Sequence, residues 1–177
     1  MTAAVDSAFD VALWFTDQAL NTNEYLQPQK LQRLLFLAQS YYTVAFSGRT
    51  LMPAHFVADE MGPLEPNVYK AFANGRPNVE VEIFMAPEVE EFLYSIWRRF
   101  GHHSVEHLTR LTRKTPAYRQ AYQRGPRSEI QLQAMRLSFT RAESTPPVAK
   151  VTGQKVLRSQ TGKPVAVKAW TPGRSKK

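Results

Sequence analysis

The fold class follows from residues 28–46, PQKLQRLLFLAQSYYTVAF. Pro28 suits the first turn of a helix, where its missing N–H costs no hydrogen bond, and Gly48 suits the left-handed position that ends one. Between them, large apolar side chains occupy nearly every side of a helical cylinder. A helix that is apolar all round has to be surrounded by other helices. Residues 28–46 are therefore predicted to be the buried central helix of a compact, mainly helical domain.

The flanking sequence predicts further helices, with apolar residues at helical spacing between Ser or Pro starts and Gly stops. These helices are expected at about residues 7–20, 66–72, 87–100, 104–111, 116–122 and 128–139. Two short stretches have extended character instead. Residues 54–58 and the alternating Val79-Glu80-Val81-Glu82-Ile83 are predicted to pair as a small two-stranded β element.

The distribution of charge divides the chain into two domains. Residues 1–143 hold 15 basic and 15 acidic side chains, whereas residues 144–177 hold 8 basic and no acidic ones. With Pro146-Pro147 at the boundary, this predicts a helical domain over 1–143 and a basic flexible tail over 144–177. Within the domain, residues 1–91 carry a net charge of −7 and residues 92–143 carry +7. Such asymmetry predicts a dipolar surface that favours charged partners.

The composition excludes several classes of protein. The chain contains no cysteine, which rules out disulfides, cysteine-ligated metals and thiol catalysis, and fits a reducing compartment. The first residues lack the basic and apolar regions of a signal peptide. The most apolar run, residues 34–46, is too short and too interrupted to cross a membrane. We expect a cytoplasmic protein that has no membrane association and needs no cofactor.

Motifs for catalysis or metal binding are equally weak. The hydrolase, P-loop and dinucleotide-binding fingerprints are all missing from the sequence, so we expect no enzyme. Asp59 and Glu60 could form a carboxylate pair for acid–base chemistry, but a solvated turn or a contact for a basic partner explains them better. His103 and His107 are four residues apart and lack a third ligand, so no metal site is predicted.

Three segments, in order along the chain, resemble the signatures of the Panacea domain, a family first noticed in phage-associated GepA-like proteins. The resemblance covers about residues 5–142. Its segments are residues 28–46; Phe56-Val57-Ala58, Gly62-Pro63 and Pro66-Asn67-Val68-Tyr69-Lys70-Ala71-Phe72; and Phe100-Gly101, Ser104, Leu108, Leu111-Thr112, Pro116, Tyr118 and Ala121. The sequence departs from the family at Asp59 and Met61, where Trp and Tyr are common, at Arg113, where His is usual, and at Ala117-Tyr118, where a Trp is typical.

The resemblance implies an antitoxin that neutralises a protein toxin by binding it. The SocA branch of the family, which this chain resembles, delivers its toxin to the ClpXP protease and so acts as a proteolytic adaptor. The toxin-binding candidates are Asp59, Glu60, Met61 and Tyr69. Met61 stands out because methionine adapts its shape to irregular partner surfaces.

The tail contains one island with alternating apolar residues, Lys163 to Trp170. Three interpretations stay open: a plain linker, a peptide that docks on ClpX by strand addition, and an arm that binds nucleic acid. The candidates for tethering the protease are Pro164, Val165, Val167, Lys168 and Trp170. The alternative function is a DNA-binding transcriptional regulator that represses its own operon. We expect nucleic-acid binding to be weak, because residues 1–143 have no net charge.

Overall fold

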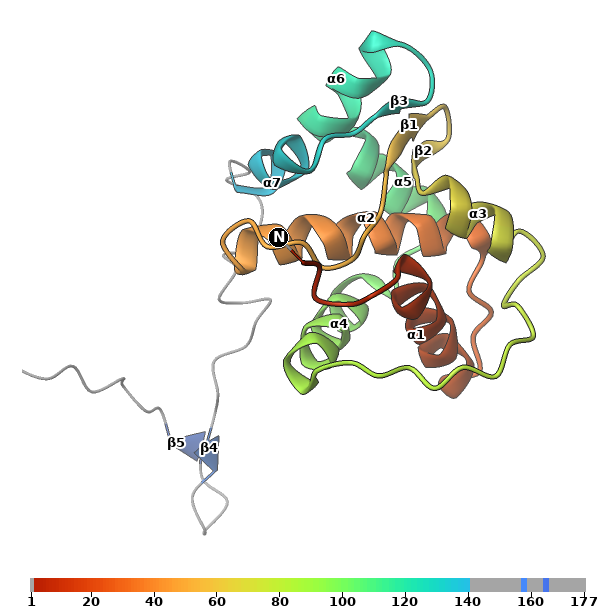
Figure 1. The fold of residues 1–177 in the computed structure, drawn as a ribbon, viewed down its shortest axis with the longest axis vertical. Helices are drawn as coiled ribbons and strands as arrows, with labels where there is room; N and C mark the ends of the chain where they lie inside the picture. The colour runs from red at the N-terminus through yellow and green to blue at the C-terminus, as the bar shows by residue number, and fades with distance from the viewer. Residues whose placement is uncertain (1, 141–156, 159–163, 166–177) are drawn as a thin grey trace, which may run out of the picture.

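The computed structural model describes residues 2–140, 157–158 and 164–165 (Figure 1). Within these residues the chain is mainly helical, as predicted. The helices are α1 Ala8–Asn21, α2 Pro28–Ala45, α3 Pro66–Phe72, α4 Pro87–Phe100, α5 Val105–Arg113, α6 Pro116–Arg124 and α7 Leu132–Thr140. The described helices include none that is long and apolar enough to span a lipid bilayer.

Helix α2 is the centre of the core, which confirms the prediction for residues 28–46. It crosses the middle of the molecule in Figure 1 and packs against α1, α3, α4, α5 and α7. Every residue from Leu31 to Thr43 is buried. Pro28 occupies the start of the helix and Gly48 follows its end with a φ of +91°. The all-round apolar surface of this segment is thus fully used in packing.

Local sequence signals set the other helix boundaries as well. Pro66, Pro87 and Pro116 each occupy the first turn of a helix, where proline loses no hydrogen bond. The side chains of Ser7 and Ser104 cap α1 and α5 by accepting hydrogen bonds from backbone N–H groups. These starts agree with the predicted ones because capping depends only on neighbouring residues.

The β element differs from the prediction. Strand β1, Val57–Asp59, pairs on one side with β2, Gly62–Leu64, and on the other with β3, Ser128–Glu129, in an antiparallel sheet of order β2-β1-β3. The helix that was expected from residue 128 therefore begins only at Leu132, after β3. Of the segment 54–58 that was predicted to be extended, Val57 and Ala58 form a strand, but the predicted strand partner was wrong.

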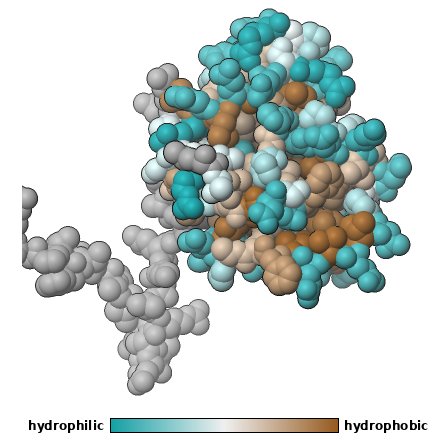
Figure 2. All heavy atoms as spheres, in the orientation of Figure 1, coloured by the Kyte–Doolittle hydropathy of each residue, from teal (hydrophilic) through white to brown (hydrophobic). Residues whose placement is uncertain are grey.

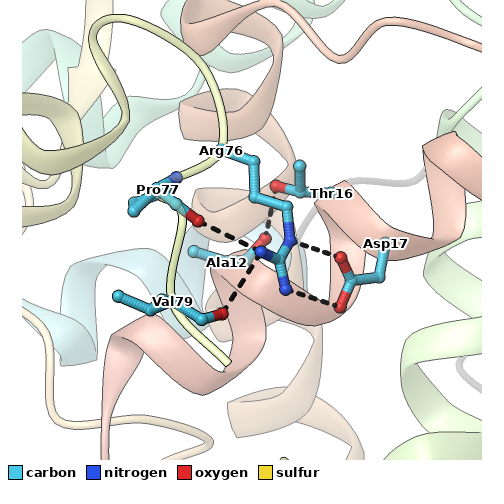
Figure 3. Close-up of polar contacts among 6 residues, drawn as sticks. All are labelled: Ala12, Thr16, Asp17, Arg76, Pro77 and Val79. Carbon is cyan, nitrogen blue, oxygen red and sulfur yellow. Dashed lines mark hydrogen bonds and ion pairs between the residues drawn. The ribbon is translucent and has the colours of Figure 1, made fainter. Parts of the chain in front are cut away.

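Residues 79–83 form no strand, although their side chains alternate. Both edges of β1 are already occupied, and Arg76 fixes the start of this segment on α1 instead (Figure 3). Its guanidinium donates hydrogen bonds to the Asp17 carboxylate at 2.6 and 3.4 Å and to the backbone oxygens of Pro77 and Val79. The segment that follows leaves Phe84 85% exposed. Figure 2 shows hydrophobic residues gathered on the lower part of this face of the molecule.

The described residues of the tail form a small ladder. Strands β4, Leu157–Arg158, and β5, Pro164–Val165, pair antiparallel to each other. Residues 141–156, 159–163 and 166–177 lie outside the described part. The division at residue 143 therefore stays a prediction.

Candidate functional site

The turn between β1 and β2 brings the predicted binding residues to one place. Asp59 ends β1, and Glu60 and Met61 form the turn itself. Tyr69 on α3 joins Asp59 and Met61 in lining a pocket of about 110 Å³ beside the turn, whereas Glu60 is exposed outside it. Three of the four predicted residues thus surround one small pocket.

The buried Arg33 of α2 holds the β1–β2 turn in place by hydrogen bonds to its backbone. Its guanidinium donates hydrogen bonds to the backbone oxygens of Met61 and Pro63, and to Thr109 Oγ1 at 3.3 Å. The residue is only 2% exposed, and burial lowers the pKa of Arg33 to about 10, so the side chain is still protonated at neutral pH. A buried charge satisfied by backbone oxygens fixes the path of the turn, because releasing it would leave the charge without partners.

Gly62 makes this arrangement possible. Its φ is +130°, a conformation that side-chain-bearing residues rarely adopt. A Cβ atom at this position would lie 2.7 Å from Arg33 Cζ, which is closer than packed carbon atoms approach. The glycine therefore serves both the backbone conformation and the close approach of the guanidinium.

Two further contacts hold the first half of the turn. The hydroxyl of Tyr118 on α6 donates a hydrogen bond to the backbone oxygen of Asp59. The Asp59 carboxylate accepts a hydrogen bond from the Met61 N–H at 3.3 Å and faces Arg127 Nε at 3.8 Å. The Asp59 carboxylate is thus engaged within the turn, whereas Glu60 is exposed beside it.

The pocket beside the turn contains an unpartnered donor. Gln32 is fully buried, and its Oε1 accepts a hydrogen bond from the Glu65 N–H at 2.8 Å. Its Nε2 has no hydrogen-bond partner among the described residues, although Gln32 is one of the pocket-lining residues. A buried N–H without an acceptor costs free energy, and this one is closed to solvent although its residue lines the pocket. Sequence reasoning missed Gln32, because one polar residue in an apolar helix gives no sign of its environment.

The outer surface of the turn is partly apolar. Met61 is 61% exposed at its tip, and Tyr69 is 37% exposed at the rim of the pocket. Glu60 adds an exposed carboxylate between the two strands. Apolar side chains that stay exposed on a firmly held backbone are typical of protein-binding surfaces.

A second surface was missed by the sequence analysis. Helices α5 and α6 form an open groove of about 500 Å³. Its lining includes two tyrosines and four exposed cations: Tyr118, Tyr122, Arg110, Arg113, Lys114 and Arg119. The +7 charge of residues 92–143 was the available signal, but a charge count does not show which cations share a face.

The three histidines lie together at the start of α5. The ring centroids of His102 and His103 are 4.1 Å apart, and those of His103 and His107 are 4.3 Å apart. Burial, and then the neighbouring imidazoles, lower the pKa of His103 below its ordinary value. Between residues 2 and 140, these histidines and the acidic side chains nowhere gather three potential ligands around a common metal position.

The predicted tether residues are described only in part. Pro164 and Val165 form β5. Val167, Lys168 and Trp170 lie outside the described residues.

Comparisons with protein-family models, with curated proteins and with solved structures gave no match for this chain.

Proposed function

We propose that this protein is a cytoplasmic antitoxin of the Panacea type that binds a protein toxin through the β1–β2 turn and delivers it to the ClpXP protease through its tail. The observation that carries the proposal is the exposed Met61 on a turn that Arg33 and Gly62 hold from below. A binding role without catalysis agrees with the use of the Asp59 carboxylate inside the turn.

The rigidity of the turn favours binding. A surface loop that has to be ordered on binding loses conformational entropy, and that loss weakens the complex. Here the backbone oxygens of Met61 and Pro63 already bond to a buried guanidinium, so little order remains to be imposed. The Met61 side chain keeps its own freedom and can adapt to an irregular toxin surface.

The pocket beside the turn adds a polar contact. Gln32 Nε2 is buried without an acceptor, and a turn of this side chain toward the pocket would present its N–H to a carbonyl, carboxamide or carboxylate oxygen of the toxin. A volume of about 110 Å³ suits a small polar side chain rather than a whole ligand molecule. The toxin would therefore insert an oxygen-bearing side chain beside Tyr69 while its surface covers Met61.

The tail supplies the link to the protease. A flexible tether that holds cargo beside an unfoldase converts capture into an intramolecular step at roughly millimolar effective concentration. The island from Lys163 to Trp170 has the alternating apolar residues that strand addition needs. Core and tail would then have separable functions.

The test uses the product of the neighbouring gene as the candidate toxin. Met61→Arg should weaken binding at least about tenfold, because a charge replaces an apolar contact at the centre of the interface. Leu20→Arg on α1 is the matched control, since Leu20 is also an exposed apolar residue, at 56%, and should keep full affinity. Equal affinity of both variants and the unmodified protein would place the interface elsewhere.

A further inference from the structure

We infer that the groove between α5 and α6 is a binding site for single-stranded nucleic acid, with the cations on its rim holding phosphates and Tyr122 stacking on a base. This activity is additional to toxin binding, and its groove is lined by none of the proposed toxin-binding residues. It also differs from the tail arm considered above, because it belongs to the folded core.

The cations of the groove are not paired with carboxylates of the described residues. Residues 105–127 contain six basic side chains and one acidic one, Glu106. Within residues 2–140, Arg110, Arg113, Lys114 and Arg119 form no ion pair with a carboxylate. Four uncompensated cations around one groove create a positive potential that attracts polyanions. Three of the four are arginines, whose planar guanidinium binds phosphate oxygens in pairs.

The floor of the groove is aromatic. The rings of Tyr118 and Tyr122 stack with centroids 5.7 Å apart and an interplanar angle of 12°. Tyr118 is only 3% exposed, and its hydroxyl donates a hydrogen bond to the β1–β2 turn. This hydrogen bond fixes the Tyr118 ring in place. Tyr122 is 39% exposed, so its ring is available to a flat ligand. Cations beside an accessible aromatic face are the arrangement that single-stranded nucleic-acid sites use, since every base has a surface that stacks.

Two other polyanions fit the groove less well. An acidic peptide would pair with the cations, but its carboxylate side chains have no flat face to stack on Tyr122. In a duplex the bases are already stacked on each other, so their faces are closed to Tyr122. The aromatic floor therefore favours a single strand over both.

The experiment measures fluorescence anisotropy of a labelled thymidine oligonucleotide of about twelve nucleotides with the full-length protein, between about 50 and 200 mM salt. The double variant Arg110→Glu/Arg119→Glu reverses two groove cations. Arg98→Glu/Arg136→Glu makes the same change in net charge at exposed positions on α4 and α7. The groove variant should bind at least about tenfold more weakly and with a smaller salt dependence, whereas the control should lose much less.

The aromatic contact has its own readout. Tyr122→Ala should weaken binding about tenfold while the salt dependence stays unchanged, because stacking releases no counterions. Equal losses in the groove and control variants would show attraction by overall charge, the tail included, and would overturn the proposal. So would unchanged binding by the groove variant, or tighter binding of an oligoglutamate peptide or of a duplex. Urea denaturation of the groove variants checks that they keep a cooperative fold.

Discussion

The hydroxyl of Tyr118 donates a hydrogen bond of 2.6 Å to the backbone oxygen of Asp59, which joins α6 to the β1–β2 turn. The ring of the same tyrosine lines the groove between α5 and α6. One buried side chain thus contributes its hydroxyl to one candidate surface and its ring to the other.

Removal of this hydroxyl should loosen the turn while keeping the aromatic ring in the groove. Tyr118→Phe keeps the ring and leaves the Asp59 oxygen without its donor, so the free energy of unfolding should fall by about 0.5–1.5 kcal/mol. Urea denaturation measures the loss. Tyr122→Phe is the matched control: it removes a hydroxyl from a tyrosine that is 39% exposed, and should change stability by less than about 0.5 kcal/mol.

The contact between Gly62 and Arg33 can be separated from backbone strain. Gly62→Ala should destabilise the fold by about 2–4 kcal/mol, because the new methyl group adds a clash with the guanidinium to the cost of a positive φ. Gly75→Ala provides the comparison, since Gly75 has a φ of +95° and the nearest atoms to its Cβ position are 3.9 Å away. If both variants lose the same free energy in urea denaturation, the guanidinium makes no contribution.

Loss of the Gln32 donor should weaken toxin binding, in addition to the folding cost of placing a carboxyl group at a fully buried position. Gln32→Glu keeps an oxygen that can accept the Glu65 N–H and replaces the unpartnered N–H group by a second acceptor. Repulsion between this acceptor and the oxygen of the toxin should cost about 1–3 kcal/mol of binding free energy in calorimetry. Gln120→Glu, an equal change at an exposed position of α6, should leave the affinity unchanged.

Acidification should destabilise the fold through His103. Its pKa is lowered from 6.5 by burial, and then by the adjacent His102 and His107, so the unfolded chain binds a proton more readily than the folded one. Stability should therefore be highest above pH 6.5, fall as the pH drops through that value, and level off below the folded pKa. In thermal melts His103→Gln should show less of this acid-induced loss than the unmodified protein, whereas His55→Gln should retain it.

Changes in the tail should impair toxin degradation, whereas changes in the core should impair toxin binding. Truncation after Glu143 should leave toxin binding intact and abolish toxin degradation by reconstituted ClpXP, because the tether is lost. Within the tail, Val165→Asp/Val167→Asp should cause most of that defect, since charges are costly in a strand-docking groove. Val148→Asp/Val151→Asp is the matched control. Degradation at the full rate without the tail would mean that the core contacts the protease directly.

The helices were predictable from sequence because their signals are local. The prolines at 28, 66, 87 and 116 mark helix starts whatever surrounds them. Strand pairing was not predictable, because β1 takes a partner from residues 128–129, and the alternation of residues 79–83 does not show that both edges of β1 are occupied. Local alternation indicates an extended chain, and only the tertiary structure assigns it a neighbour.

The candidate binding residues were predicted in part. Asp59, Met61 and Tyr69 follow from the turn signal at Gly62-Pro63 and the resemblance around it. The supporting Arg33 and the donor Gln32 lie in the central apolar helix, where sequence gives no reason to expect a buried charge or an unpartnered amide. The basic groove was not predicted, because the charges of residues 1–143 sum to zero and a sum does not show which cations share a surface.

The contacts around the β1–β2 turn come from segments that are far apart along the chain. Tyr118 is 59 residues from Asp59, and Arg33 is 30 residues from Pro63. Contacts of this separation form only after long loops have been ordered, so the turn acquires its shape late, when most of the core is in place. A toxin that recognises the shaped turn would consequently bind the completed fold and stabilise it by mass action, while half-folded chains would compete poorly for it.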